Sequence, residues 1–223
     1  MDGETGRGRA PKETSRLVAA VTHEVVSPVS NIAGLSRLLT GDPQAALDDK
    51  TRDLLLRIRR NSVRLVHLVE EASTLARHHW ELDAPQREKV DLRDIVDGAL
   101  LDVVEVVGTG ANGPDVRLPE GDLAAEGDPK RLRLAIGGLF LNLAKDLNNR
   151  RLTLALERAG SGWRITVWHA AIEGENGPFA EVEGEGGGPS AVVVLELFKS
   201  LGCAGKVFVS PEGARRIEVE IPQ

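Results

Sequence analysis

Apolar residues near the start of the chain recur at intervals of alternately three and four. The first run comprises Val18, Val21, Val25, Pro28, Ile32, Leu35 and Leu39. This heptad spacing predicts a helix over residues 15–40, which the Gly41-Asp42-Pro43 sequence ends. A second run with the same spacing comprises Leu55, Ile58, Ser62, Leu65, Val69, Ala72 and Ala76. Two such helices joined by a short loop predict an antiparallel hairpin.

The hairpin has more apolar positions than one pair of helices can bury. Beside the two heptad seams it carries flanking apolar residues such as Leu54, Val66 and Leu68. Pairing two hairpins into a four-helix bundle would bury both sets, so the pattern favours a homodimer. The alternative is a monomeric hairpin that packs against its own C-terminal domain.

The pattern changes after residue 90, where helical and alternating segments are mixed. Asp91 and Asp128 are typical helix N-caps, and they predict helices over 92–107 and 132–147. Alternating apolar residues over 152–156 and 163–167 predict a β-hairpin, and a third helix is predicted over 190–200. Two strands should then flank the turn at 211–213. The fold class of this part is α+β.

Composition narrows the class of protein. No stretch of the sequence is long and apolar enough to span a membrane, and the polar opening is not typical of a secretory signal. The formal net charge of −6, concentrated after residue 90, argues against nucleic acid as a partner. A single cysteine, Cys203, excludes a disulfide framework and fits the reducing cytoplasm. Cys203 precedes a predicted strand and is expected to be a small buried hydrophobe.

The most informative local sequence surrounds His23. In the heptad numbering His23 falls at the outermost position, so its imidazole should face solvent, with Glu24 beside it and Ser27 one turn further on. Pro28 lies inside the helical pattern, where it removes a backbone hydrogen bond. The string H-E-V-V-S-P-V-S-N-I, residues 23–32, resembles the H-box of sensor histidine kinases, commonly H-E-[LI]-x-[TS]-P-L-x-x-I.

The resemblance extends to residues 88–92, which look like the E-x-V-D-L junction of these kinases, and to residues 128–132, which look like the start of their N-box helix. It implies a disordered segment 1–13, a dimerisation and phosphotransfer hairpin 14–82 that forms a dimeric four-helix bundle, and a linker 83–90. A shortened, degenerate ATPase-like α/β sandwich over 91–223 would follow.

The resemblance also implies site residues. His23 would accept a phosphoryl group and pass it to an aspartate of a response-regulator receiver domain. A neutral imidazole nitrogen is nucleophilic near pH 7, and Glu24 would raise its basicity through a hydrogen bond. Ser27 would orient a water for dephosphorylation. Mg²⁺ is expected on the partner receiver and no metal on this chain.

The C-terminal part departs from the kinase pattern at its ligand-binding positions. The two N-box asparagines read Gly138 and Asn142, and Asn142 is interpreted as a vestigial residue on a polar helix face. The D-x-G-x-G motif should follow the 165–167 strand, but the sequence there is Trp168-His169-Ala170-Ala171. No lysine or arginine occurs between residues 165 and 198, whereas five glutamates, at 173, 175, 181, 183 and 185, line the segment that would form the lid over a nucleotide. Their charge would repel a triphosphate.

ATP binding is therefore not expected, and no cofactor is predicted for this chain. The combination resembles the dimeric histidine phosphotransferases built from degenerate kinases, of the ChpT and sporulation-phosphorelay kind. The phosphoryl group would come from one receiver domain and go to another, with a hybrid histidine kinase as a further partner.

Two alternatives remain open at the level of sequence. The chain could be a non-catalytic scaffold or pseudokinase that regulates a two-component system, or an ATP-dependent sensor kinase with a divergent pocket. The other histidines, His67, His78, His79 and His169, lack metal-ligand spacing and are interpreted as structural or solvated.

Overall fold

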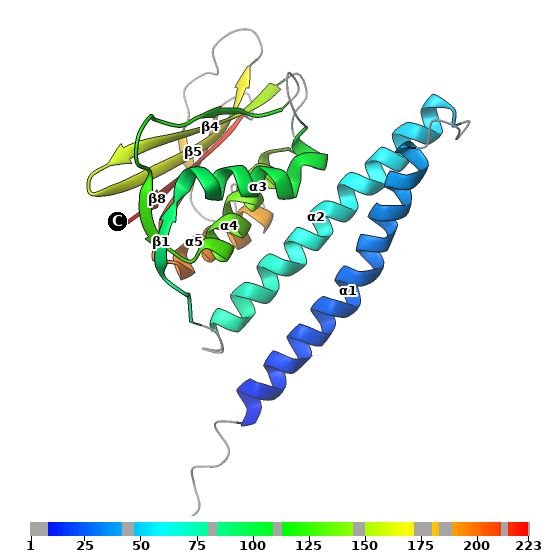
Figure 1. Ribbon diagram of the computed structural model, residues 1–223, viewed down its shortest axis with the longest axis horizontal. Helices are drawn as coiled ribbons and strands as arrows, with labels where there is room; N and C mark the ends of the chain where they lie inside the picture. The colour runs from blue at the N-terminus through cyan, green and yellow to red at the C-terminus, as the bar shows by residue number, and fades with distance from the viewer. Residues whose placement is uncertain are drawn as a thin grey trace, which may run out of the picture. The chain divides into compact units, whose positions relative to one another are not determined.

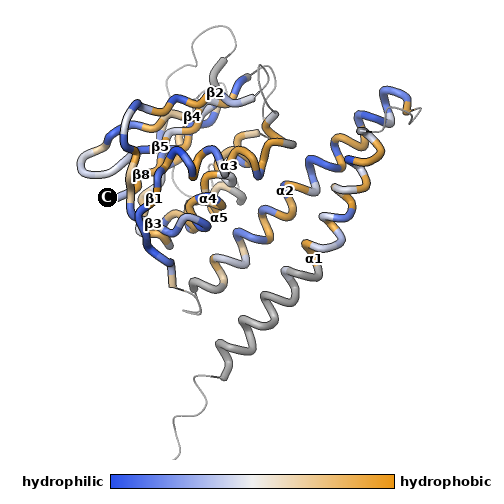
Figure 2. Tube along the Cα trace, in the orientation of Figure 1, coloured by the Kyte–Doolittle hydropathy of each residue, from blue (hydrophilic) through white to orange (hydrophobic). Residues whose placement is uncertain are grey.

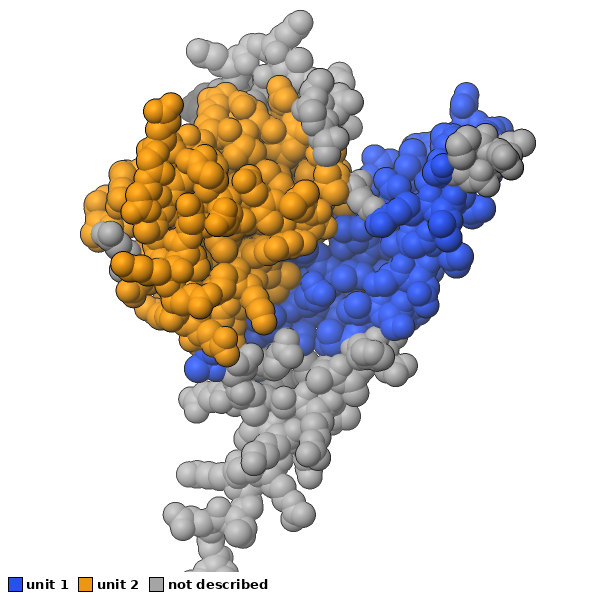
Figure 3. All heavy atoms as spheres, viewed as in Figure 1, with its two compact units in different colours: residues 1–84 blue, residues 85–223 orange. Residues whose placement is uncertain are grey.

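The computed structural model describes residues 9–41, 47–79, 84–108, 113–144, 150–171, 180–182, 189–210 and 214–222. For residues 9–21, 23, 24, 77–79, 105, 150, 170, 171, 182, 189 and 190 it describes the backbone but not the side chain. The chain divides into two compact units, Met1–Ala84 and Pro85–Gln223 (Figure 3).

The first unit is a helical hairpin. Helix α1 spans Arg9–Gly41 and α2 spans Asp49–His79, and the two lie side by side in opposite directions (Figure 1). Helix α1 begins earlier than the heptad pattern predicted and continues through Pro28. At the loop end, Arg52 Nη1 donates to Thr40 O over 2.7 Å, which satisfies a carbonyl in the last turn of α1.

The start of α2 is capped by Asp48. Its Oδ1 accepts a hydrogen bond of 2.7 Å from Thr51 N. The backbone hydrogen bond from Thr51 lowers the pKa of the Asp48 carboxyl, because it stabilises the charged form. The cap and the Arg52 contact together fix the ends of the two helices at the loop.

The second unit is an α+β sandwich. Its elements are β1 (Glu88–Asp91), α3 (Leu92–Val107), β2 (Asp115–Arg117), β3 (Ala124–Gly127), α4 (Pro129–Leu143), β4 (Arg150–Ala159), β5 (Gly162–Ala171), β6 (Ala180–Val182), α5 (Pro189–Ser200), β7 (Ala204–Val209) and β8 (Arg215–Ile221). Six strands form one sheet in the order β2-β4-β5-β8-β7-β6, and β1 pairs with β3 in a separate ribbon. All pairs are antiparallel except β2 with β4.

The core lies between the large sheet and the three helices α3, α4 and α5, which lie to one side of it (Figure 1). The inward sheet residues include Leu154, Ile165 and Val219, each 0% exposed. Helix α4 is buried almost all round because α3, α5 and β5 pack against it; the buried residues run from Arg131 to Leu143 with two exceptions. Figure 2 shows hydrophobic colouring on α4 and α5 and, mixed with hydrophilic colouring, on α3 and the strands.

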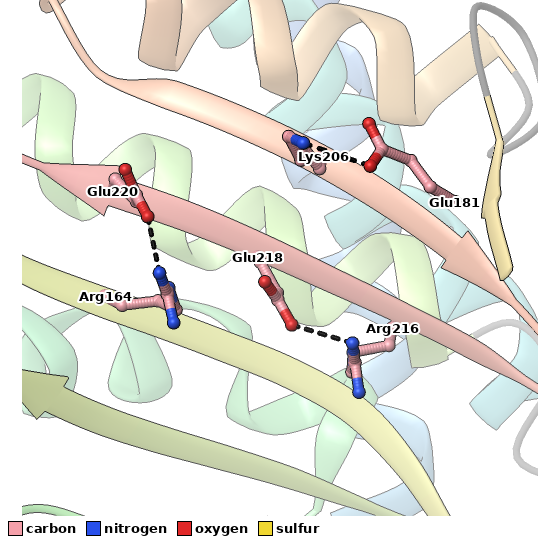
Figure 4. A network of polar contacts seen from close by, with 6 residues as sticks. All are labelled: Arg164, Glu181, Lys206, Arg216, Glu218 and Glu220. Carbon is pink, nitrogen blue, oxygen red and sulfur yellow. Dashed lines mark hydrogen bonds and ion pairs between the residues drawn. The ribbon is translucent and has the colours of Figure 1, made fainter. Parts of the chain in front are cut away.

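The outer face of the sheet carries charged residues that pair with one another. Figure 4 shows three such pairs: Arg164 Nη2 with Glu220 Oε1 at 2.6 Å, Arg216 Nη2 with Glu218 Oε1 at 2.9 Å, and Lys206 Nζ with Glu181 Oε2 at 3.0 Å. The Arg164 pair is directly opposite in the β5–β8 register. This face is therefore polar and solvated, as expected for an antiparallel sheet covered on one side.

Candidate phospho-acceptor site

The predicted phospho-acceptor lies in the helical hairpin. His23 and Glu24 fall inside α1, and their side chains lie outside the described residues. Ser27 and Pro28 follow in the same continuous helix, and both are exposed. Residues 23 and 27 are one helical turn apart, so they share a face of α1. The structure thus places the H-box sequence on an uninterrupted helix, while the solvent-facing position of the His23 imidazole stays a prediction.

The hairpin exposes many large apolar side chains. The α1 set consists of Ile32 (46% exposed), Leu35 (61%), Leu38 (71%) and Leu39 (47%). The α2 set consists of Leu54 (50%), Ile58 (43%), Leu65 (43%) and Leu68 (38%). Five of these eight are seam positions of the heptad pattern, so one hairpin leaves much of its seam in solvent. An exposed apolar surface of this kind is typical of an interaction face.

The other histidines lie outside the H-box sequence, and two of them, His67 and His169, have described side chains. His67 Nδ1 lies 3.3 Å from Glu71 Oε1, and both residues are buried. The side chains of His78 and His79 lie outside the described residues. Within the described part of the chain, no group of His, Cys, Asp or Glu side chains could hold a metal ion. Cys203 is buried as predicted, and this burial raises the pKa of its thiol to about 11.

The structure shows that Asn142, the vestigial N-box residue, lies in the core of the second unit. Asn142 is only 3% exposed, so the interpretation of it as a residue on a polar helix face is wrong. Gly138, one turn earlier, is buried as well. The reason is that α4 lies between α3, α5 and the sheet and has almost no solvent-facing side along this stretch.

His169 occupies the strand end where the resemblance expects the D-x-G-x-G motif. It is 0% exposed, and its Nε2 lies 2.7 Å from Leu143 O at the end of α4. Arg215 N, at the start of β8, donates to its Nδ1 over 3.4 Å. Because a carbonyl oxygen can only accept, Nε2 carries the proton and Nδ1 accepts. One neutral imidazole therefore joins α4, β5 and β8.

The sequence interpretation of His169 as structural is supported, but its role as a link was missed. The signal was available: Ile165, Val167 and His169 alternate along β5, and all three are fully or almost fully buried. A histidine at the third inward position of a strand needs hydrogen-bond partners in the core.

Most of the glutamate-rich and glycine-rich region, residues 172–179 and 183–188, lies outside the described residues. Glu181 is described, and it pairs with Lys206 across β6 and β7. Lys199 lies 3.2 Å from Glu196 on the same helix.

No helix of the described chain is long and apolar enough to cross a membrane. No curated protein matches the sequence. Residues 13–79 match the family of His Kinase A (phospho-acceptor) domains.

The solved structures that are similar to the chain include two that align over most of its length. The histidine kinase AdeS of Acinetobacter baumannii aligns with a TM-score of 0.54 at 18% identity, covering 90% of this chain and 97% of that one. Full-length ShkA in complex with AMPPNP aligns with a TM-score of 0.55 at 18% identity, covering 93% of this chain and 45% of that one. At this identity the likeness shows the fold. Residues 13–79 thus match the phospho-acceptor domains of histidine kinases, and the chain as a whole, hairpin and α+β unit together, has a fold similar to that of the histidine kinase AdeS.

Proposed function

We propose that the chain is a dimeric histidine phosphotransferase, which carries a phosphoryl group on His23 between response-regulator receiver domains and binds no ATP. The observation that carries the proposal is the H-box sequence inside a helix that matches the phospho-acceptor family. This match supports the acceptor role of His23, since in such a domain the imidazole is the phosphorylated group.

The proposed transfer needs little chemistry from this chain. The imidazole nitrogen of His23 attacks the phosphorus of the receiver's aspartyl phosphate, an N–P bond forms, and the O–P bond to the aspartate breaks. The other ring nitrogen of His23 donates a hydrogen bond or its proton to the Glu24 carboxylate. In the separate hydrolysis of the phosphoryl group, Ser27 positions the attacking water. The Mg²⁺ belongs to the receiver, where it neutralises charge on the phosphoryl oxygens.

The absence of ATP binding is supported by the sequence of the second unit and by His169. The chain lacks a D-x-G-x-G sequence after the β5 core residues, and the histidine found there is committed to Leu143 O and to the Arg215 amide. A side chain whose two ring nitrogens are both hydrogen-bonded within the protein has no nitrogen left to hydrogen-bond an adenine.

Dimerisation is supported by the exposed apolar residues of the hairpin. Leu35 and Leu39 on α1 and Ile58 and Leu65 on α2 are all heptad-seam positions, and all are more than 40% exposed. A second hairpin with the same surface would cover them in a four-helix bundle. Phospho-acceptor domains of this family typically dimerise and act with response regulators, which agrees with the proposal.

The test is phosphoryl transfer from a phosphorylated receiver domain to the purified chain, compared between wild type and His23→Ala. The matched control is Ser30→Ala, an exposed residue of the same helix at a variable position of the H-box pattern. We expect acid-labile label on the wild type and on Ser30→Ala and none on His23→Ala. Glu24→Gln should transfer on the order of 10²-fold more slowly. Equal labelling of His23→Ala would overturn the assignment.

A further inference from the structure

The segment that leaves the helical hairpin is held by a buried carboxylate of the second unit. Gln86 N donates a hydrogen bond of 2.9 Å to Asp128 Oδ2. The other oxygen, Asp128 Oδ1, accepts from Arg131 N over 3.0 Å and so caps α4. One carboxylate therefore caps its own helix with one oxygen and holds a residue 42 positions earlier in the chain with the other.

Burial and charge favour this arrangement. Asp128 is 7% exposed and Arg131 6% exposed, and Arg131 Nε lies 3.4 Å from Asp128 Oδ2. A buried carboxylate is costly unless it is paired and accepts hydrogen bonds, and here both conditions are met. Hydrogen bonds to a charged acceptor are also stronger than those between neutral groups. The Gln86 amide thus has a strong, fixed acceptor although the Gln86 side chain is exposed.

Two further contacts attach the same segment. Arg87 Nη2 donates to Leu201 O over 3.4 Å, in the turn after α5. That turn contains Gly202 with φ of +82°, and a β-carbon on Gly202 would lie 3.1 Å from Arg87 Nη2. From Glu88 onward the chain pairs with β3, starting with Glu88 opposite Gly127. Residues 86–88 are therefore held successively by α4, by the α5–β7 turn and by β3.

We propose that Asp128 is a positioning residue that couples the first turn of α4 to the exit of the chain from the hairpin. Through its two oxygens, any displacement of the α4 N-terminus is transmitted to Gln86, which lies ahead of the first strand. The second unit therefore begins functionally at Pro85–Gln86, and Gln86 moves with α4. This inference does not depend on phosphotransfer by His23.

The two oxygens can be separated by one substitution. In Asp128→Asn the amide oxygen still caps α4, since asparagine is a good N-cap, but the NH₂ group cannot accept the Gln86 N–H. The matched control is Asp91→Asn, which alters the N-cap of α3, where Asp91 Oδ1 accepts from Arg93 N over 2.8 Å. Neither residue belongs to the proposed phosphotransfer site.

The readout is amide hydrogen exchange of the full-length chain, followed at Gln86, with tryptic cleavage after Arg87 as a second measure. In the wild type we expect a protected Gln86 amide. In Asp128→Asn its exchange should be at least about tenfold faster, and cleavage after Arg87 should be faster too, because a hydrogen bond to a charged group is lost. Asp91→Asn should leave both unchanged.

Two results would overturn the proposal. One is an unprotected Gln86 amide in the wild type, a measurement that holds even if Asp128→Asn fails to fold. The other is the same Gln86 protection in folded Asp128→Asn as in the wild type.

Discussion

The two units of the chain differ in what each of them lacks. The hairpin carries the H-box sequence but leaves large apolar side chains in solvent, as with Leu35 at 61% and Leu38 at 71% exposed. The α+β unit buries its core, with Phe140 and Phe198 at 0% exposed, but lacks the sequence motifs that bind a nucleotide in kinases. The hairpin therefore matches a phospho-acceptor sequence but leaves apolar surface uncovered, whereas the described part of the α+β unit buries most of its large apolar side chains.

The difference reflects what a packed core and a phospho-acceptor helix each require of the amino-acid sequence. A core is specified by volume and apolarity, so the α+β fold persists when ligand-binding residues are replaced by others that satisfy their own hydrogen bonds. His169 illustrates this, since it is fully buried and bonded on both ring nitrogens. A phospho-acceptor helix instead requires one accessible imidazole on a rigid support, and the four-helix bundle would supply that support.

The largest expected effect concerns the apolar surface of the hairpin. Leu35→Asp should weaken dimerisation by about 10²–10⁴-fold, since burial of a leucine contributes about 1.5–3 kcal/mol and a two-fold dimer loses it twice. Sedimentation over a range of concentrations measures the change. The control is Leu101→Asp on α3, where the leucine is 70% exposed in the other unit. A monomeric wild type, or equal effects of both substitutions on dimerisation, would contradict a dimer interface on the hairpin.

A smaller effect is expected at His169. The His169→Leu variant removes the hydrogen bonds that the imidazole makes with Leu143 O and with the Arg215 N–H, which should cost about 1–3 kcal/mol per bond in free energy of unfolding. Chemical denaturation followed by tryptophan fluorescence measures it. The His169→Gln variant, with one donor and one acceptor, should recover part of the loss. If His169→Leu is as stable as wild type, the imidazole does not hold these elements together.

The smallest effect is expected on the outer face of the sheet. A double-mutant cycle of Arg164→Ala and Glu220→Ala should give a coupling of about 0.2–1 kcal/mol, because both side chains are largely solvated. Added salt should reduce it further. A coupling of several kcal/mol would show that the charged face contributes to folding as much as the core does.

Much of the fold could be predicted from sequence where local signals were strong. Helix α3 begins and ends where the pattern placed it, because Asp91 is a clear N-cap and Gly108, with φ of +83°, ends the helix. Strands β4 and β5 were predicted from alternation, although both extend further than the apolar residues do.

Short strands were not predictable in the same way. Strands β1, β2, β3 and β6 have three or four residues, which is too few to show an alternation of apolar and polar positions. Strand β1 forms because it pairs with β3, more than 30 residues away in the sequence. The burial of Asn142 was missed because it depends on neighbours on several sides of α4. Of the candidate site, the helical setting of His23 and Ser27 could be read from the heptad pattern, while the Asp128 anchor required the tertiary structure.

We propose that His23 receives its phosphoryl group from a receiver domain and not from ATP. The most direct measurement compares labelling of one wild-type preparation by γ-labelled ATP with Mg²⁺ alone and by a phosphorylated receiver domain. We expect label from the receiver and none above background from ATP alone. Label from ATP alone, absent in His23→Ala, would contradict it and make the chain an autophosphorylating kinase.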